Sequence, residues 1–285
     1  MSVTYGNLNV DEKYSSILEP NLYYNSVFAP GKTFTDKYEI GPAGGIYVHK
    51  LDTSAVTVGT PGRDFTDVTA SDSLIQIVLN NNFQQSKKIY GVQAAAVSIN
   101  LANEELSVAM AEVAEAWNQA GLACLVKEGS TASTASAITK NNVKKMVLAA
   151  RQEIVEAKGK ADVLLCTPAT FATILEAAGA EYIPQANEYM NKTGAVGTWL
   201  GLTVLECSGL SASSGKYYNA AGSLTTASFS AVDFIMYNKE ALSIVTNFDV
   251  ARIVDSENFN GSKAQVEMNS GFKVTSTAQV VVKKH

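Results

Sequence analysis

Histidines and cysteines are the side chains in this sequence best suited to catalysis or metal binding. The chain has two histidines, His49 and His285, and three cysteines, Cys124, Cys166 and Cys207. Neither histidine has the neighbouring carboxylates or cysteines that a catalytic triad or a histidine-ligated metal requires. The cysteines lack the Cys-x-x-Cys spacing of zinc sites and redox pairs, so we expect buried thiols in a reducing compartment. We therefore predict no catalytic residue, no metal site and no cofactor.

Motifs that bind phosphate or activate a nucleophile are also missing. The glycine-rich stretch 41–45 precedes an expected strand, whereas a nucleotide cradle would precede a helix. No serine lies in a Gly-x-Ser-x-Gly elbow. The basic face of a helix expected at 140–158 could contact phosphate, although a solvated face is the commoner role. An α/β enzyme or small-molecule binder thus remains the least favoured alternative.

The composition points to a surface that is covered by other molecules. Hydrophobic residues make up 46% of the chain and charged residues 17%, against roughly 25% charged in typical soluble domains. Such a surface is a solubility risk for a monomer but suits a protein surrounded by its own copies. The net charge of −5 gives no basic footprint for nucleic acid. No signal peptide and no membrane-spanning run is recognisable.

The elements expected at the start of the chain are extended. The first 38 residues lack a helical or strand period but are rich in aromatic residues, namely Tyr5, Tyr14, Tyr23, Tyr24, Phe28, Phe34 and Tyr38. Disordered tails are poor in aromatic residues, so we expect a strap buried against another surface, such as a neighbouring subunit. Alternating residues at 44–52 and 73–80, with a turn at Pro61 and Gly62, predict a long hairpin that rests on something else.

Helices and then strands are expected further on. A stripe at three- and four-residue steps predicts a helix at 101–127 with a core face of Leu106, Met110, Val113 and Trp117. At 1.5 Å per residue this helix is a rod of roughly 40 Å. A strand at 162–166, a helix from Pro168 and a strand at 199–206 follow as an α/β segment. Strands are expected at 229–237, 242–246, 263–268 and 278–283.

The order of these elements resembles the major capsid proteins of tailed bacteriophages, which have the Hong Kong 97 fold. Three stretches are similar to segments of that family: 161–175 (ADVLLCTPATFATIL), 197–210 (GTWLGLTVLECSGL) and 229–247 (FSAVDFIMYNKEALSIVTN). The resemblance implies an α+β fold with an N-terminal arm at 1–38 and an extended loop (E-loop) at 39–76. It also implies a peripheral (P) domain at 77–158 and 229–285 with the spine helix 101–127, and an axial (A) domain at 159–228.

The resemblance implies a structural protein, not an enzyme, that assembles into the icosahedral head shell of a tailed phage. The expected partners are copies of itself in hexamers and pentamers, separate scaffolding and portal proteins, and enclosed double-stranded DNA bound without sequence specificity. The protein would assemble into shells in the host cytoplasm and would be located in the virion. No membrane partner is expected. An encapsulin-like compartment shell is the alternative within the same fold.

Residues of the arm and the loop are the expected contacts between subunits. They are Tyr14, Tyr23, Tyr24, Phe28, Phe34, Tyr47, His49, Lys50, Arg63 and Phe65. Many members of the family carry a long N-terminal scaffolding segment. The sequence reaches the hairpin by residue 39, so we expect a separate scaffold. Lys50 lies in the loop, but no motif assigns it to a cross-link between subunits.

Overall fold

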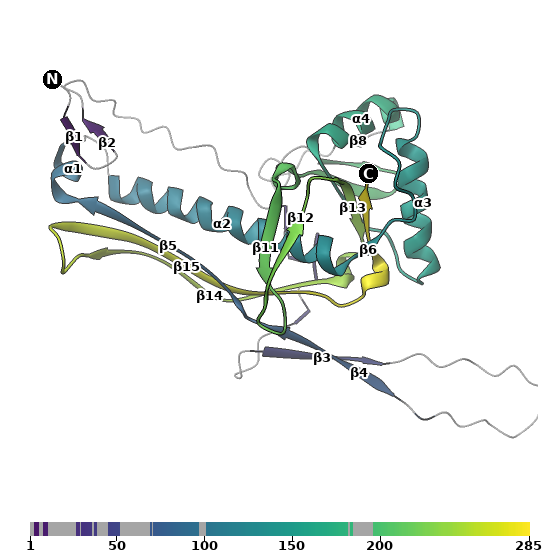
Figure 1. Ribbon diagram of the computed structural model, residues 1–285, viewed down its shortest axis with the longest axis horizontal. Helices are drawn as coiled ribbons and strands as arrows, with labels where there is room; N and C mark the ends of the chain where they lie inside the picture. The colour runs from purple at the N-terminus through teal and green to yellow at the C-terminus, as the bar shows by residue number, and fades with distance from the viewer. Residues whose placement is uncertain are drawn as a thin grey trace, which may run out of the picture.

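The computed structural model describes residues 3–5, 8–10, 27–28, 30–35, 37–38, 45–51, 69, 71–96, 101–181, 183–184 and 196–285. Figure 1 shows a long helix lying along a three-stranded sheet, which leads into an α/β unit with helices packed on one side. A two-stranded hairpin projects away from both parts. None of the helices in these ranges is long and apolar enough to cross a membrane.

The α/β unit is built on a seven-stranded sheet. Its strand order is β6 (Ser130–Thr131), β16 (Val280–Lys284), β13 (Val232–Tyr237), β7 (Val163–Cys166), β10 (Leu202–Glu206), β9 (Val196–Trp199) and β8 (Ile183–Pro184). β7 and β10 are parallel, as are β6 and β16, and the other neighbours are antiparallel. The sheet is therefore mixed.

Both faces of this sheet are covered, which explains its continuous apolar strands. Leu164 and Cys166 belong to a core shared with α3 (Val143–Glu156) and α4 (Pro168–Ala178). Their neighbours Val163 and Leu165 belong to a second core on the opposite face. The predicted start of α4 is confirmed: Pro168 opens it, and the Oγ1 of Thr167 accepts a hydrogen bond from the Thr170 amide at 3.3 Å.

The predicted division into domains cuts through this sheet. The resemblance places β13 and β16 in the P domain, and β7 and β10 in the A domain. In the structure β13 pairs directly with β7, so the boundaries at 158/159 and 228/229 separate hydrogen-bonded strands. The sequence could show where strands lie, but not that the last strands return to the middle of this sheet.

The long helix α2 (Leu101–Glu128) confirms the predicted spine. It packs on a sheet of order β14 (Leu242–Asp255), β15 (Gly261–Val274) and β5 (Asn81–Tyr90). Val113 and Ala109 are buried against Val266 of β15. Further along, residues 120–126 are buried all round, because the helix end is enclosed by the second core of the α/β unit.

The expected core face of α2 needs one correction. Met110 is 49% exposed, and the small side chain of Ala109 faces the sheet in its place. Lys87 of β5 binds Glu105 and Glu112 on one flank of the helix. The helical period then places Met110 on the other flank. Val113 is buried, whereas Leu106 and Trp117 are partly buried and pack against the core.

Smaller elements complete the fold. They are the pair β1 (Val3–Tyr5) and β2 (Leu8–Val10), the hairpin β3 (Gly45–Leu51) and β4 (Asp72–Val78), α1 (Gly91–Ala96), and the hairpin β11 (Ser214–Tyr218) and β12 (Leu224–Ser228). Short 3₁₀ turns occupy Gly179–Glu181, Ser208–Ser211, Lys239–Ala241 and Thr277–Gln279. β5, α1, β11 and β12 were not predicted.

Candidate assembly surface

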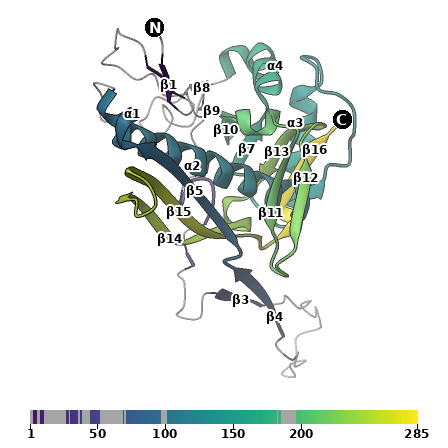
Figure 2. The ribbon, with the colours of Figure 1, turned by 60° about the vertical axis from the view of Figure 1, so that its left-hand side comes forward.

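The hairpin of β3 and β4 confirms the predicted two-stranded excursion. Figure 1 and Figure 2 both show it projecting away from α2 and from the helices of the α/β unit. Its register pairs Tyr47 with Gln76 and His49 with Leu74. Since paired residues share a face, Tyr47, His49, Leu74 and Gln76 lie together on one side. The tip, with Arg63 and Phe65, lies outside the described residues.

This face of the hairpin carries two large apolar side chains that are open to solvent. Tyr47 and Leu74 are each 55% exposed, an unusual position for large apolar side chains on a ribbon two strands wide. The polar groups bond across the strands: the Gln76 amide donates to the Tyr47 hydroxyl at 3.1 Å, and His49 Nδ1 lies 2.5 Å from Asp72 Oδ2. Lys50 is also exposed. The hairpin thus presents an ordered surface that a second molecule could cover.

Phe28 and Phe34 of the arm are buried in this chain's own body, which corrects two expected contacts between subunits. The Phe28 ring packs edge-on against Trp117 with centroids 5.9 Å apart. Phe28 and Phe34 are both 6% exposed and belong to the core next to α2. A Cβ on Gly121 would lie 2.5 Å from the Phe28 ring, so this glycine makes room for it. Tyr14, Tyr23 and Tyr24 lie outside the described residues.

Backbone bonds fasten the same segment along its length. The Asn118 side chain accepts a hydrogen bond from the Val27 amide at 3.1 Å. The Thr35 amide donates to the Leu242 carbonyl at 3.0 Å, where Thr35 forms a bridge with Ser243 of β14. Of the predicted strap, residues 27–28 and 33–35 are buried, whereas 31–33 form a turn. These buried residues use their own subunit as the support.

Other exposed apolar side chains are spread over the outer elements. On α3 they are Leu148 and Val155, and at the far end of the three-stranded sheet they are Tyr90, Val92, Ile253 and Val254. Tyr90 packs against Phe259 with ring centroids 5.1 Å apart. These positions lie at opposite ends of the molecule in Figure 1. Such a distribution suits contacts with several neighbours more than a single ligand site.

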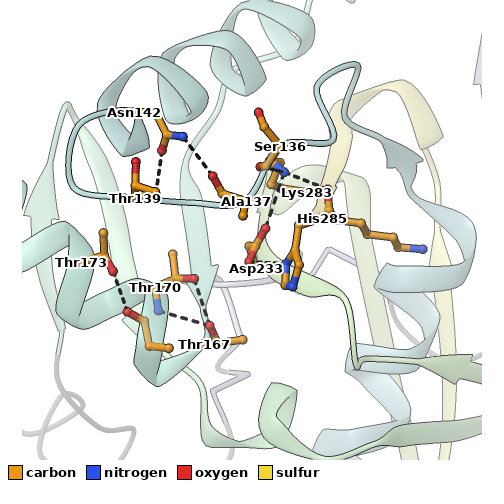
Figure 3. Close-up of polar contacts among 12 residues, drawn as sticks. Ser136, Ala137, Thr139, Asn142, Thr167, Thr170, Thr173, Asp233, Lys283 and His285 are labelled. Carbon is orange, nitrogen blue, oxygen red and sulfur yellow. Dashed lines mark hydrogen bonds and ion pairs between the residues drawn. The ribbon is translucent and has the colours of Figure 1, made fainter.

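A cluster of charged groups lies at the start of β13 (Figure 3). The Lys283 ammonium is buried, donates to the Ser136 carbonyl at 2.7 Å and lies 3.5 Å from Asp233 Oδ2. His285 Nδ1 lies 2.8 Å from Asp233 Oδ1. The Asp233 carboxylate on β13 therefore contacts both Lys283 and His285. Through Lys283, which also bonds to Ser136, the cluster connects β13 and β16 to the linker before α3. These contacts give the cluster a structural role, since they hold three segments of the chain together.

The threonines beside this cluster are also satisfied locally. Thr170 Oγ1 lies 3.0 Å from Thr167 Oγ1, and the Thr173 hydroxyl donates to the Ala169 carbonyl at 3.0 Å (Figure 3). These bonds hold the first turns of α4. The burial of Lys283 could not be predicted from the sequence, because a lysine at a strand end is usually exposed.

The three cysteines are buried thiols, as predicted. Burial raises the pKa of Cys124 and that of Cys166 well above the ordinary value for a thiol. A reactive cysteine needs the opposite shift. Within the described ranges, no group of three or more histidine, cysteine or carboxylate side chains has an arrangement that could hold a metal ion.

Comparison with solved structures identifies the fold. A structure from Mycobacterium phage Che8 superposes with a TM-score of 0.68 at 15% identity, over 98% of this chain and 98% of that chain. The capsid structure of cyanophage P-SCSP1u gives 0.64 at 12% identity, covering 100% and 92%. The mature capsid of bacteriophage PhiM1 gives 0.60 at 14%, covering 100% and 91%. No protein-family model and no curated protein sequence matches. The chain therefore has the α+β fold of these phage capsid structures, as its sequence predicted.

Proposed function

We propose that this protein is the major capsid protein of a tailed phage, and that its copies form the icosahedral shell around the DNA. The observation that carries the proposal is the match to capsid structures over the whole length, 98% or more of this chain in the Che8, P-SCSP1u and PhiM1 structures. A fold alone does not define a function. The exposed hairpin and the distribution of apolar side chains add independent support.

The hairpin is the main proposed contact between neighbouring subunits. Burial of Tyr47 and Leu74 would contribute most to the free energy of association, because each Å² of apolar surface removed from water contributes about 25 cal/mol. His49 lies on the same face as Tyr47 and Leu74, and Lys50 lies on the opposite face of the ribbon; both are proposed polar contacts. Arg63 and Phe65 are proposed contacts at the tip, and Tyr14, Tyr23 and Tyr24 in the arm.

A shell places one chain in several similar environments. To close a ring, each head-to-tail contact must rotate one subunit relative to the next by a fixed angle. We propose that such contacts form both hexamers and pentamers. A body with a projecting ribbon suits this requirement, because the ribbon can join neighbouring copies while each body keeps its shape. We also propose separate scaffolding and portal partners, assembly in the host cytoplasm and a final location in the virion.

The DNA would be enclosed without recognition of its sequence. The net charge is −5, and phosphate contacts by a basic surface would add affinity that hinders release of the genome. The protein in this proposal performs no reaction, since its role is geometric.

Assembly of the purified chain tests the proposal. Tyr47→Ser combined with Leu74→Ser removes apolar surface from the exposed face of the hairpin without touching a buried residue. We expect the unaltered chain to form closed particles in electron micrographs and the double variant to remain as small oligomers with an unchanged melting temperature. Ser107→Ala, at an exposed position of α2, is the matched control. Closed particles from the double variant would contradict the role of the hairpin, and a chain that never assembles would contradict the proposal.

A further inference from the structure

The root of the hairpin, residues 77–81, is a bend that the structure holds from two sides. β4 ends at Val78 and β5 begins at Asn81. The Asn80 amide donates to the Val78 carbonyl at 3.0 Å, which closes a tight turn between the two strands. Ile77, just before the turn, is 1% exposed. The projecting ribbon therefore starts from a buried and bent root.

β15 supports one side of this root. A Cβ on Gly271 would lie 2.7 Å from the Val78 carbonyl oxygen and 3.3 Å from the Ile77 side chain. Only a glycine allows this approach, because any other residue would push the hairpin away from the sheet. The contact fixes the distance of the root from β15.

The turn between β11 and β12 supports the other side through two asparagines. The Asn81 side chain donates to the Tyr218 carbonyl at 3.1 Å and accepts from the Tyr218 amide at 2.7 Å. It thus pairs with one residue of β11 as a neighbouring strand would. The Asn80 side chain donates to the Asn219 carbonyl at 2.9 Å. Asn81 is only 3% exposed, so its amide depends on these bonds.

The turn that receives these bonds is itself well fixed. The Asn219 side chain accepts hydrogen bonds from the amides of Ala221 and Ser223, each at 3.0 Å. Gly222 adopts a φ of 73°, a conformation that favours glycine. β11 and β12 in turn pack on α2. The carbonyls of Tyr218 and Asn219 are therefore held in place relative to the spine helix.

We infer that Asn80 and Asn81 position the hairpin: they clamp its root to the β11–β12 turn and so set the direction in which it projects. Both asparagines come from one strand junction, and both partners come from a hairpin about 140 residues away along the chain. The consequence for assembly rests on the proposed function, whereas the clamp is a property of the single chain. The next residue, Asn82, is different, because it is exposed and bonds to Glu267 across the sheet at 3.0 Å.

Distance measurements between two spin labels test the clamp in the unassembled full chain. One label is placed at Leu74→Cys on the hairpin and the other at Ser107→Cys on α2, both at exposed positions. The three native cysteines are buried and react slowly with the label. We expect one narrow distance distribution in the labelled parent. Asn80→Ala and Asn81→Ala should shift and broaden it, and Asn82→Ala, the matched control, should not.

Two readouts separate the clamp from the proposed function. A distribution that stays narrow and unshifted in both Asn80→Ala and Asn81→Ala would overturn the inference. Should Asn81→Ala fail to fold, Asn80→Ala decides alone, because it removes one bond at a partly exposed site. Electron microscopy of the same variants reports on assembly: a broadened distribution in a chain whose parent forms no particles would support the clamp and contradict only the capsid role.

Discussion

At the scale of single residues, Glu128 connects three elements at the end of α2. Its carboxylate accepts hydrogen bonds from the Tyr217 hydroxyl at 3.2 Å and from the Lys273 ammonium at 3.0 Å. The Val274 amide donates to it at 3.1 Å. β11 and β15 are thereby joined to the end of the spine helix at one partly buried point.

Tyr217 should make the protein sensitive to alkaline pH. Burial, and then the nearby Cys124 and Glu128, raises the pKa of Tyr217 in the folded chain far above its usual value. In the unfolded chain the phenol loses its proton near pH 10. The stabilisation is therefore complete below about pH 10 and is lost as the pH rises further. We expect the free energy of unfolding, measured with urea between about pH 8 and 11, to fall less steeply in Tyr217→Phe; equal slopes would contradict this role.

Trp117 links the arm, the helix and the sheet. Its ring lies 6.0 Å from that of Phe272 and its Nε1 donates to Ser270 Oγ at 3.0 Å, while Phe28 packs on the other side. We expect Trp117→Ala to lower the free energy of unfolding by roughly 3–5 kcal/mol. Met110→Ala, on the exposed flank of the same helix, should change it by less than about 0.5 kcal/mol. Denaturant titration measures both, and equal effects would show that the helix faces were assigned wrongly.

At the scale of elements, the pairing of β5 with α2 depends on a lysine that points inward. Burial alone would lower the pKa of Lys87, but the hydrogen bond and charge of Glu112, with Glu105, outweigh it and raise the pKa. Lys87 Nζ lies 3.0 Å from Glu112 and 3.5 Å from Glu105. A partly buried, charge-assisted pair of this kind holds the strand against the helix.

Removing this lysine should deprive Glu105 and Glu112 of the cation that they share. We expect Lys87→Met to lower the free energy of unfolding by about 1–3 kcal/mol, and Lys88→Met, on the exposed side of the same strand, to change it by less than about 0.5 kcal/mol. Thermal and urea unfolding of the two variants provide the comparison. A Lys87→Met variant as stable as the parent would mean that β5 is held by apolar contacts alone.

The same lysine explains why β5 could not be predicted from the sequence. Its inward residues are Phe83, Gln85, Lys87 and Ile89, so polar and apolar types do not alternate. By contrast, α2 and β7 were predicted well because their buried residues are apolar and regularly spaced. β14 is longer than predicted, because its outer half carries charged residues such as Arg252 on a solvent-facing side. β15 continues past the predicted end at 268 through Asn269, Ser270 and Gly271, which are weak strand formers.

At the scale of the whole molecule, the order of the elements carried more information than any single residue. The sequence had no motif for chemistry, and its capsid fold was predicted from the succession of strap, hairpin, spine helix and α/β segment. The order of strands in the seven-stranded sheet and the support of Phe28 by its own subunit could not be predicted. Both depend on contacts between segments far apart in the chain.

Two truncations of the strap can separate its contribution to the stability of the chain from its proposed role in assembly. Deletion of residues 1–26 leaves Val27 and Phe28 in the core, so we expect an unchanged melting temperature but poor assembly. Deletion of residues 1–30 also removes Phe28 from its place against Trp117, and we expect a loss of roughly 3–5 kcal/mol in stability as well. Calorimetry and electron microscopy distinguish these effects. Normal closed particles from the shorter deletion would contradict a role for the arm in assembly.

The most direct test is a cryo-electron microscopy reconstruction of particles formed by the purified chain. The account predicts closed icosahedral shells in which β3 and β4 of each subunit lie on a neighbouring subunit, with Tyr47 and Leu74 buried at that contact. A chain that stays monomeric at high concentration, or a shell in which these two side chains face solvent, would contradict it.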